Sequence, residues 1–477
     1  MRVRIFTLLI FVLNSYFGFA QQKFETALEH LLQQPEYKNA SVGIHIQDLE
    51  SGETLFELNS NKLLIPASTM KLISSASALE MLGADYRFKT KLGYIGETEK
   101  NNVLNGDLII IGGADPTLGS EHFMGHYFNP HFLQVWAQKI KSANIQQIIG
   151  DLILDTSIYD SEKVPATWIW EDIGNYYGAA ANAFTVYDNL FRIAFNSPRK
   201  IGKATKITSM YPKIEGLEII NEVVSADNYS DLAYVFGSPF DKKRVIRGTI
   251  PRNRKAFTIK AAIHQPEELL AEEFLKYLAN EGVFISGEIK FEKINKKAFQ
   301  TVYIQESPTL AEIVKVLNYE SVNLFAEHLV KQIAFEKIGV GNRQSGIELI
   351  EEFWKSKGIS TEYLFMEDGS GLSHFNAVSP AFFTAVLNFM TKRSTNKKTF
   401  LNSLPGAGEG TLKRFDKELF PENTLKAKSG SMTRVRCYAG YLDVDSGAKV
   451  AFSIMFNNFS GSHSKLADEI EKLLHNF

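Results

Sequence analysis

The sequence predicts an α/β protein of the α+β kind, with an antiparallel sheet flanked by helices, a helical subdomain and nested β-rich insertions. Three observations predict this fold. Strand patterns occur at both ends of the chain, two before residue 60 and three after residue 420. Segments with apolar residues at helical spacing follow Ser307-Pro308. Between about 88 and 300, short strand-like runs alternate with Gly, Pro and Asn.

The first 20 residues have the pattern of a secretory signal peptide. Arg2 and Arg4 precede an apolar run from Ile5 to Leu13, and small residues lead up to Ala20. We therefore expect cleavage near Ala20 and a periplasmic or otherwise exported protein. No later run is apolar for long enough to cross a bilayer, so no transmembrane segment is expected in the mature chain.

Charge and cysteine content exclude other classes. The 52 Lys and Arg residues nearly balance 54 Asp and Glu residues, and neither sign forms a long run, which argues against a nucleic-acid partner. Cys437 is the only cysteine, so no intrachain disulfide can form. The length is too great for a single compact core.

The two ends of the chain are expected to build one discontinuous domain. A helix over 24–34 and strands over 42–46 and 54–58 come first. The remaining expected elements of this domain are helices over 310–318, 322–337, 346–357, 380–391 and 464–475 and strands over 424–427, 438–442 and 450–456. Residues 21–87 and 301–477 are therefore assigned to this domain, after the signal peptide over 1–20.

Residues 88–300 are assigned to the inserted β-rich region, which we expect to hold two nested domains. Its clearest predicted elements are strands over 90–95, 106–111, 148–154, 192–195 and 283–289 and a helix over 267–280. His122, His126 and His131 suggest a metal site, because the first two have helical spacing. Gly125 and Pro130 weaken that helix, and no carboxylate arrangement completes a ligand set, so no metal and no cofactor is expected.

The strongest candidate for chemistry is Ser68, three residues before Lys71 where a helix begins. This spacing puts the hydroxyl and the amine on one helix face. The residues that follow are small and apolar, which indicates a buried helix whose environment lowers the pKa of Lys71. A neutral amine there can take the proton of Ser68, which needs such a base. The same spacing recurs four times, but in polar segments that read as loops, turns or solvated helix starts.

Two further motifs supply partners for this pair. Ser321 and Asn323 lie at a predicted helix-to-helix junction, and Lys428-Ser429-Gly430-Ser431 lies at the end of a predicted strand. Ser321 can relay a proton, Asn323 can hold a substrate carbonyl and Lys428 can stabilise developing negative charge. Gly430 lets a substrate backbone lie along the strand edge, and the hydroxyls of Ser429 and Ser431 can bind a carboxylate. The backbone N–H groups of Ser68 and Ser431 are the predicted oxyanion hole.

Ser-x-x-Lys, Ser-x-Asn and Lys-[Ser/Thr]-Gly in this order are the signature of penicillin-binding proteins and serine β-lactamases. The chain resembles the class C, low-molecular-mass penicillin-binding proteins of the D-alanyl-D-alanine carboxypeptidase/endopeptidase family, peptidase family S13. The stretches 113–118, 368–373 and 404–408 also resemble this family, as do the roughly 250 residues between Ser68 and Ser321. Ser429 departs from the usual threonine of the third motif, although it keeps the hydroxyl.

The resemblance implies a penicillin-binding-protein/β-lactamase-like transpeptidase domain that acts on peptidoglycan stem peptides, with β-lactam antibiotics as covalent inhibitors. It allows both removal of the terminal D-Ala and cleavage of cross-links between D-Ala and a diamino acid. Two alternatives stay open. One is a β-lactamase or esterase on the same scaffold, and the other is a non-catalytic wall-binding homologue.

Overall fold

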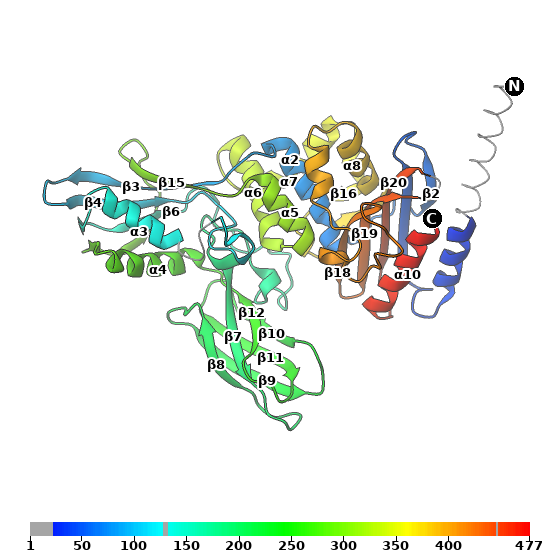
Figure 1. The fold of residues 1–477 in the computed structure, drawn as a ribbon, viewed down its shortest axis with the longest axis horizontal. Helices are drawn as coiled ribbons and strands as arrows, with labels where there is room; N and C mark the ends of the chain where they lie inside the picture. Colours follow the sequence, from blue (N-terminus) through cyan, green and yellow to red (C-terminus); the bar gives the residue numbers. More distant parts are fainter. Residues whose placement is uncertain (1–21, 127–131, 445–446) are drawn as a thin grey trace. The chain divides into compact units, whose positions relative to one another are not determined.

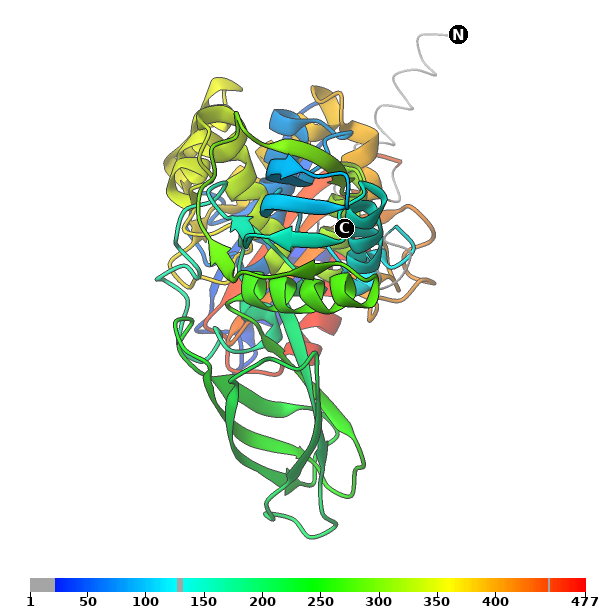
Figure 2. The same cartoon turned by 90° about the vertical axis from the view of Figure 1, so that its left-hand side faces the viewer.

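The computed structural model describes residues 22–126, 132–444 and 447–477. The predicted signal peptide and His131 lie outside the described residues. The chain divides into two compact units, shown in two views in Figures 1 and 2. Unit 1 comprises Met1–Ala84, Val314–Val322 and Ile347–Phe477, and unit 2 comprises Asp85–Ile313 and Asn323–Gly346.

Unit 1 is built on a five-stranded sheet in the order β18-β19-β20-β1-β2. Every neighbouring pair is antiparallel, so strands from both ends of the chain pair directly, as the sequence predicts. The strands are β1 (Ser41–Asp48), β2 (Thr54–Leu58), β18 (Leu425–Met432), β19 (Val435–Asp443) and β20 (Lys449–Asn457). Strand β18 lies at one edge of this sheet.

Successive residues of β1 point to opposite faces of this sheet, and each face packs against different helices. Ile44 and its apolar neighbours face the helix over 22–33 and α10 (His463–Asn476), with which they form one buried cluster. His45, one residue on, faces α8 (Pro380–Lys392), where its Nδ1 lies 2.6 Å from Thr384 Oγ1. The sheet of unit 1 is therefore covered by helices on both faces.

Helix α2 (Met70–Leu82) packs against α8 and is buried along its first ten residues. Its small residues let neighbouring elements come close. Ser77 Oγ accepts a hydrogen bond from Trp354 Nε1 at 2.9 Å. The other helices and short strands of this part of the chain are α5 (Leu310–Glu320), α7 (Arg343–Ser356), η5 (Thr361–Tyr363), β16 (Leu364–Phe365), β17 (Ala377–Val378), α9 (Lys397–Asn402) and η6 (Gly410–Leu412).

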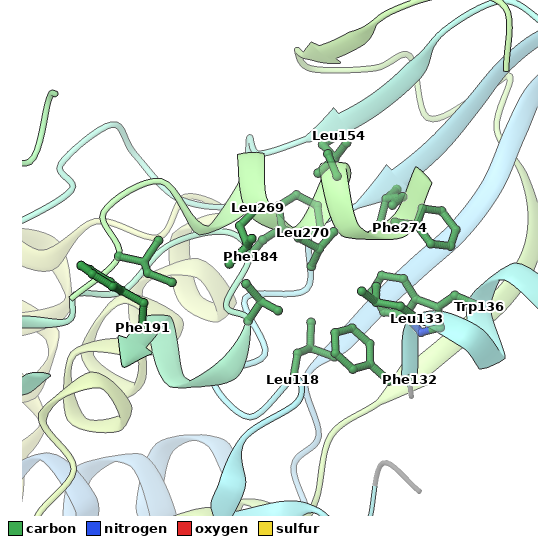
Figure 3. Close-up of a cluster of buried hydrophobic side chains, with 14 of the residues drawn as sticks. Leu118, Phe132, Leu133, Trp136, Leu154, Phe184, Phe191, Leu269, Leu270 and Phe274 are labelled. Atoms are coloured by element: carbon green, nitrogen blue, oxygen red, sulfur yellow. The ribbon is translucent and has the colours of Figure 1, made fainter. Parts of the chain in front are cut away.

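Unit 2 contains a mixed seven-stranded sheet on which α3 (Phe132–Ser142) and α4 (Pro266–Asn280) pack. Figure 3 shows the apolar cluster of this unit, with Trp136 and Phe274 among its largest buried side chains. Their rings meet edge to face, with centroids 5.9 Å apart. The strands of this sheet are β3 (Lys89–Thr98), β4 (Val103–Ile111), β5 (Gln147–Ile149), β6 (Leu152–Asp155), β13 (Phe284–Ile285), β14 (Ile289–Phe291) and β15 (Gln300–Glu306).

Two three-stranded sheets complete unit 2, in the orders β12-β7-β8 and β10-β11-β9. Their strands are β7 (Leu190–Asn196), β8 (Lys206–Tyr211), β9 (Glu218–Ala226), β10 (Leu232–Phe236), β11 (Lys243–Pro251) and β12 (Phe257–Ala262). Three short 3-10 helices also belong to this unit, η2 (Glu121–Phe123), η3 (Tyr176–Gly178) and η4 (Tyr187–Asn189). The insert is rich in strands, as predicted, but it also contains helix α3, which is not predicted from the sequence.

The prediction of one continuous strand over 283–289 is wrong. The structure has two short strands there, β13 and β14. A side chain at Gly287 would have its Cβ 2.2 Å from Asp151 Oδ1 and 2.3 Å from Gly150 O. Asp151 Oδ1 also accepts the backbone N–H of Glu288 at 2.8 Å. The close approach of this carboxylate interrupts the strand at a residue that only glycine can occupy.

The helix α6 (Asn323–Ile338) groups with the insert and not with the ends of the chain. Its contacts within unit 2 explain this grouping, since Tyr159 donates to the carbonyl of His328 and Lys331 forms an ion pair with Asp160 at 2.8 Å. The domain ranges expected from the sequence, 21–87 with 301–477 and the insert over 88–300, stay a prediction.

Candidate active site

Ser68 lies in a short 3-10 helix, η1 (Ala67–Thr69), that leads directly into α2. The preceding residue, Ala67, has a φ of +46°, a left-handed conformation that a non-glycine residue rarely adopts. Gly371 packs against it so closely that a Cβ there would lie 1.8 Å from Ala67 O. The backbone before Ser68 is therefore held in an unusual conformation by its neighbours.

The chain entering η1 is tied to the sheet by Asn457, the last residue of β20. Its side chain accepts the backbone N–H of Ile65 at 2.8 Å and donates to the carbonyl of the same residue at 3.1 Å. Cys437 on β19 is buried and donates to the Ile65 carbonyl at 3.5 Å. These hydrogen bonds fix Ile65, three residues before Ser68, against the sheet. The sequence shows nothing that singles out Asn457 for this role.

Lys71 is fully buried, as predicted, and its side-chain nitrogen lies beside the candidate nucleophile. Its Nζ is 2.9 Å from Ser68 Oγ and 2.7 Å from the carbonyl oxygen of Ser370. The carbonyl fixes the amine in place without supplying a counter-charge. The Ser-x-x-Lys spacing thus brings the two side chains into direct contact on one helix face.

The loop over 368–373 supplies this carbonyl, and Asp368 organises it. The carboxylate of Asp368 accepts the backbone N–H groups of Gly371 at 2.7 Å and Ser373 at 2.6 Å. It also accepts the side-chain amide of Asn376 at 2.9 Å. Ser74 on α2 donates to the carbonyl of Gly369 in the same loop. The loop is therefore fixed against α2 by bonds at several points, which explains its Asp, Gly and Ser composition.

The strand β18 brings the third motif against the start of α2. A Cβ at Gly430 would lie 2.8 Å from Thr69 N and 2.9 Å from Ser68 N. Lys428 is fully buried, and its Nζ donates to the carbonyl of Ser429 at 2.6 Å. Burial lowers the pKa of Lys428 well below its usual value, and the charge of Lys71 lowers it further. The two lysines are thus close enough to influence each other's protonation.

The third motif lies within a strand and not at the end of one, so the predicted strand over 424–427 is too short. Strand β18 continues to Met432 because Ser429, Gly430 and Ser431 all pair in register with β19. Pairing and burial overcome the poor strand propensity of Gly and Ser here. Ser429 is buried, and Ser431 is exposed. Both can still serve a ligand laid along the edge of the sheet.

Ser321 and Asn323 lie at the predicted junction between two helices, α5 and α6. Ser321 has a φ of +59° and forms the turn between them. It belongs to unit 1, whereas Asn323 is the first residue of α6 in unit 2. Within unit 2, the Asn323 side chain donates to the carbonyl of Tyr177 at 2.8 Å. The roles assigned to Ser321 and Asn323 stay predictions.

The histidines considered as metal ligands do not share a helical turn. The short helix η2 ends at Phe123, and His126 Nε2 lies 3.0 Å from the carbonyl of Glu306. Among the described residues, one group has three candidate ligand atoms within 4.8 Å of one another, those of Glu121, His122 and Asp188. Glu121 also forms ion pairs with Arg192 and Lys260, so cations already neutralise its charge.

Ser68 and Lys71 are hydrogen-bonded at the start of a buried helix, beside the Lys-Ser-Gly motif of the edge strand β18. This combination matches the signature of penicillin-binding and β-lactamase-like proteins. The model of the D-Ala-D-Ala carboxypeptidase 3 (S13) family matches residues 24–476. The chain therefore belongs to the S13 family of D-Ala-D-Ala carboxypeptidases, as the sequence motifs indicate.

Relatives of known identity agree with this assignment. The D-alanyl-D-alanine carboxypeptidase of Actinomadura sp. (strain R39) is 27% identical over 458 residues, which are 91% of this chain and 81% of the relative. Penicillin binding protein 4 (dacB) from Haemophilus influenzae has a similar fold, with a TM-score of 0.81 and 24% identity, over 94% of this chain and 98% of that chain. A structure of the same Haemophilus protein complexed with a β-lactam gives a TM-score of 0.76 with 23% identity over the same shares.

Proposed function

We propose that this protein is an exported serine DD-peptidase that cleaves the D-Ala-D-Ala bond of peptidoglycan stem peptides through a Ser68 acyl-enzyme. The observation that carries the proposal is the 2.9 Å separation of Lys71 Nζ and Ser68 Oγ inside a buried helix start. Family membership supplies the substrate class. Residues 21–87 and 301–477 would form the catalytic domain around this pair.

The reaction would proceed in two steps. Ser68 Oγ attacks the carbonyl carbon of the penultimate D-Ala while Lys71 takes the hydroxyl proton. The C–N bond then breaks, and the leaving amine receives a proton, for which Ser321 is the proposed relay. Water attacks the acyl-enzyme in the second step and releases the shortened peptide, with Ser68 regaining its proton. No cofactor is needed for either step.

The two buried lysines divide the acid–base work. Two ammonium groups in one buried site repel each other, which favours a state in which one of them has lost its proton. Lys71 touches the nucleophile, so the neutral amine is assigned to it. Lys428 then keeps its proton and stabilises negative charge that develops on the substrate. The charge of Lys71 is one cause of the lowered pKa of Lys428, after burial, so a neutral Lys71 makes it easier for Lys428 to keep its proton.

The edge strand β18 is the proposed substrate platform. Gly430 packs against the start of α2, where a Cβ would lie 2.9 Å from Ser68 N, and the backbone N–H groups of Ser68 and Ser431 are proposed to form the oxyanion hole. Loss of one such donor typically raises the barrier by roughly 3 kcal/mol. Ser429 and Ser431 are proposed to bind the terminal carboxylate, and Asn323 the peptide carbonyl. β-Lactams are proposed to acylate Ser68 in the same position, since a structural relative has been solved with one.

The test is product analysis with a pentapeptide and a cross-linked muropeptide dimer. The wild-type protein should release D-Ala from the pentapeptide, and cleavage of the dimer would establish endopeptidase activity as well. Ser68→Ala should lose both activities. Ser462→Ala is the matched control, because Ser462 has the same spacing to Lys465 but caps an exposed helix start. Release of D-Ala by Ser68→Ala at the wild-type rate would overturn the proposal.

A further inference from the structure

Unit 2 contains a cavity of about 250 Å³ that the proposed chemistry does not use. Four cationic side chains line it, from two separate segments of the chain. Arg87, Lys89 and Lys91 come from the segment that contains the start of β3, and Lys296 comes from the loop before β15. One carboxylate, that of Glu336 on α6, also lines the cavity.

Two of the four cations already interact with other groups of unit 2, one through an ion pair and one through a hydrogen bond. Lys89 forms an ion pair with Glu306 at 3.1 Å, and both side chains are about half exposed, so solvent screens this pair. Arg87 donates through its Nη1 to the carbonyl of Ser307 at 2.6 Å, a partner that carries no counter-charge. Among the described residues, no carboxylate lies within 4.0 Å of the ammonium groups of Lys91 and Lys296.

Glu336, the carboxylate among the described residues that line the cavity, is hydrogen-bonded to neighbouring side chains. Glu336 Oε1 accepts hydrogen bonds from Tyr86 Oη at 2.7 Å and from Gln332 Nε2 at 3.3 Å. Burial raises the pKa of Tyr86, so its phenol stays protonated and remains a donor to Glu336. The net charge of the cavity lining is therefore strongly positive, although one carboxylate lies at its edge.

The chemistry of the lining favours a compact anion. Lysine ammonium groups bind phosphate as point charges, and the guanidinium fork of arginine binds both phosphate and carboxylate groups. Three lysines beside one partly engaged arginine therefore suit a phosphate group. Gly112 and Gly113 line the β4 end of the cavity, and a Cβ at Gly113 would lie 2.4 Å from the carbonyl oxygen of Lys89, so glycine lets the two segments of the wall pack closely.

We propose that this cavity binds the phosphate group of an anionic ligand, either a soluble phosphoester or a phospholipid headgroup. Its wall and the Ser-x-Asn motif lie at opposite ends of α6. Asn323 begins this helix and Glu336 lies 13 residues further on, which corresponds to roughly 20 Å along the axis. The cavity therefore lies at the other end of α6 from Asn323, and neither Lys91 nor Lys296 is among the residues proposed for acyl transfer.

The experiment compares the wild-type protein with a Lys91→Gln/Lys296→Gln double variant. Lys255→Gln is the matched control, since Lys255 is also exposed and lies in unit 2 outside the cavity. Titration with pyrophosphate by calorimetry measures binding of the soluble group. Flotation with phosphatidylglycerol vesicles, against phosphatidylcholine vesicles, measures binding of the headgroup. Labelling with fluorescent penicillin monitors the peptidase site in every variant.

We expect pyrophosphate or phosphatidylglycerol vesicles to bind, with an affinity that falls at least tenfold in the double variant and is unchanged in the control. Pyrophosphate binding alone would identify a soluble phosphoester, and vesicle binding would identify the headgroup. Binding of neither probe would overturn the proposal, as would equal losses in the double variant and the control. Tighter binding of citrate than of pyrophosphate would also overturn it in favour of a carboxylate site. Penicillin labelling should be equal in all three proteins, so this result is independent of the peptidase assignment.

Discussion

The two units of the molecule place their buried cations in different surroundings. In unit 1, two lysines, Lys71 and Lys428, have no solvent-accessible surface. In unit 2, the most strongly perturbed buried groups include the neutral imidazoles of His264 and His328, and several cations line an open cavity. Burying an ammonium group costs far more than burying a neutral ring.

Unit 2 also buries a cation, but Lys331 is ion-paired with Asp160 at 2.8 Å. Lys71, in contrast, contacts the hydroxyl of Ser68. The comparison teaches that the partner of a buried cation, and not its burial, distinguishes chemistry from packing.

The histidines of unit 2 illustrate the packing role. His328 on α6 lies 3.0 Å from Thr185 Oγ1 through its Nε2, and burial lowers its pKa to about 3. Burial also lowers the pKa of His264 to about 3, with Arg244 contributing. Both rings are therefore neutral at physiological pH, and neither is placed beside a nucleophile.

The largest effect should come from removing the buried base of unit 1. Lys71→Met keeps the length and the packing of the side chain but removes the base. Acylation by penicillin should slow by about 10² to 10⁴-fold, while the initial non-covalent affinity changes little. Stopped-flow kinetics with a chromogenic β-lactam separates the two steps, and Lys465→Met, at the same spacing from Ser462, serves as the control. A weaker initial complex with unchanged acylation would make Lys71 a binding residue.

A smaller effect should follow from a change beside Ser68. Gly430→Ala adds a Cβ that would lie 2.7 Å from the carbonyl oxygen of Pro66 and 2.9 Å from the Ser68 nitrogen. The start of α2 must then move, and a displacement of this kind can cost on the order of 100-fold in rate. Gly125→Ala, where no atom of the described residues lies within 4 Å of the added Cβ, should leave the rate unchanged. Equal penicillin labelling rates for both variants would argue against the close contact between β18 and η1.

Acid should test the packing histidines of unit 2. A histidine whose folded pKa is about 3 contributes stability that is complete above its unfolded pKa, near 6.5. That stability is lost as the pH falls from about 6.5 toward 3, by roughly 1.4 kcal/mol per pH unit. Between pH 7 and pH 5, each of these rings should therefore lower the free energy of unfolding by about 2 kcal/mol. Urea denaturation at the two pH values measures this difference.

His328→Asn should reduce that acid sensitivity, even if it lowers stability at pH 7. The exposed His30 provides the control, since His30→Asn should leave the pH dependence unchanged. An unaltered difference between pH 7 and pH 5 in His328→Asn would show that the ring is protonated in the folded state.

Much of unit 1 could be predicted from the sequence because its signals are local. Apolar periodicity identifies α5, α7, α8 and α10, and strand alternation identifies the five strands of its sheet. The Ser68 and Lys71 contact follows from helical spacing alone. Lys428 and Gly430 are identified by a tripeptide that occurs once in the chain.

The parts that could not be predicted depend on tertiary contact. Asn457 holds Ile65 from 392 positions away in the sequence, and an asparagine at a strand end carries no local sign of this. The carbonyl of Ser370 contacts Lys71 through the backbone, which no side-chain pattern reveals. The phosphate cavity of unit 2 combines separate segments whose lysines read as ordinary solvated residues.

The central claim is that Ser68 is the acylated nucleophile of unit 1. It is tested most directly by incubating the mature protein with benzylpenicillin and locating the adduct by peptide mass spectrometry. The account predicts a single penicilloyl group on the peptide that contains Ser68, and no adduct in Ser68→Ala. An adduct on any other residue, or a labelled Ser68→Ala protein, would contradict it.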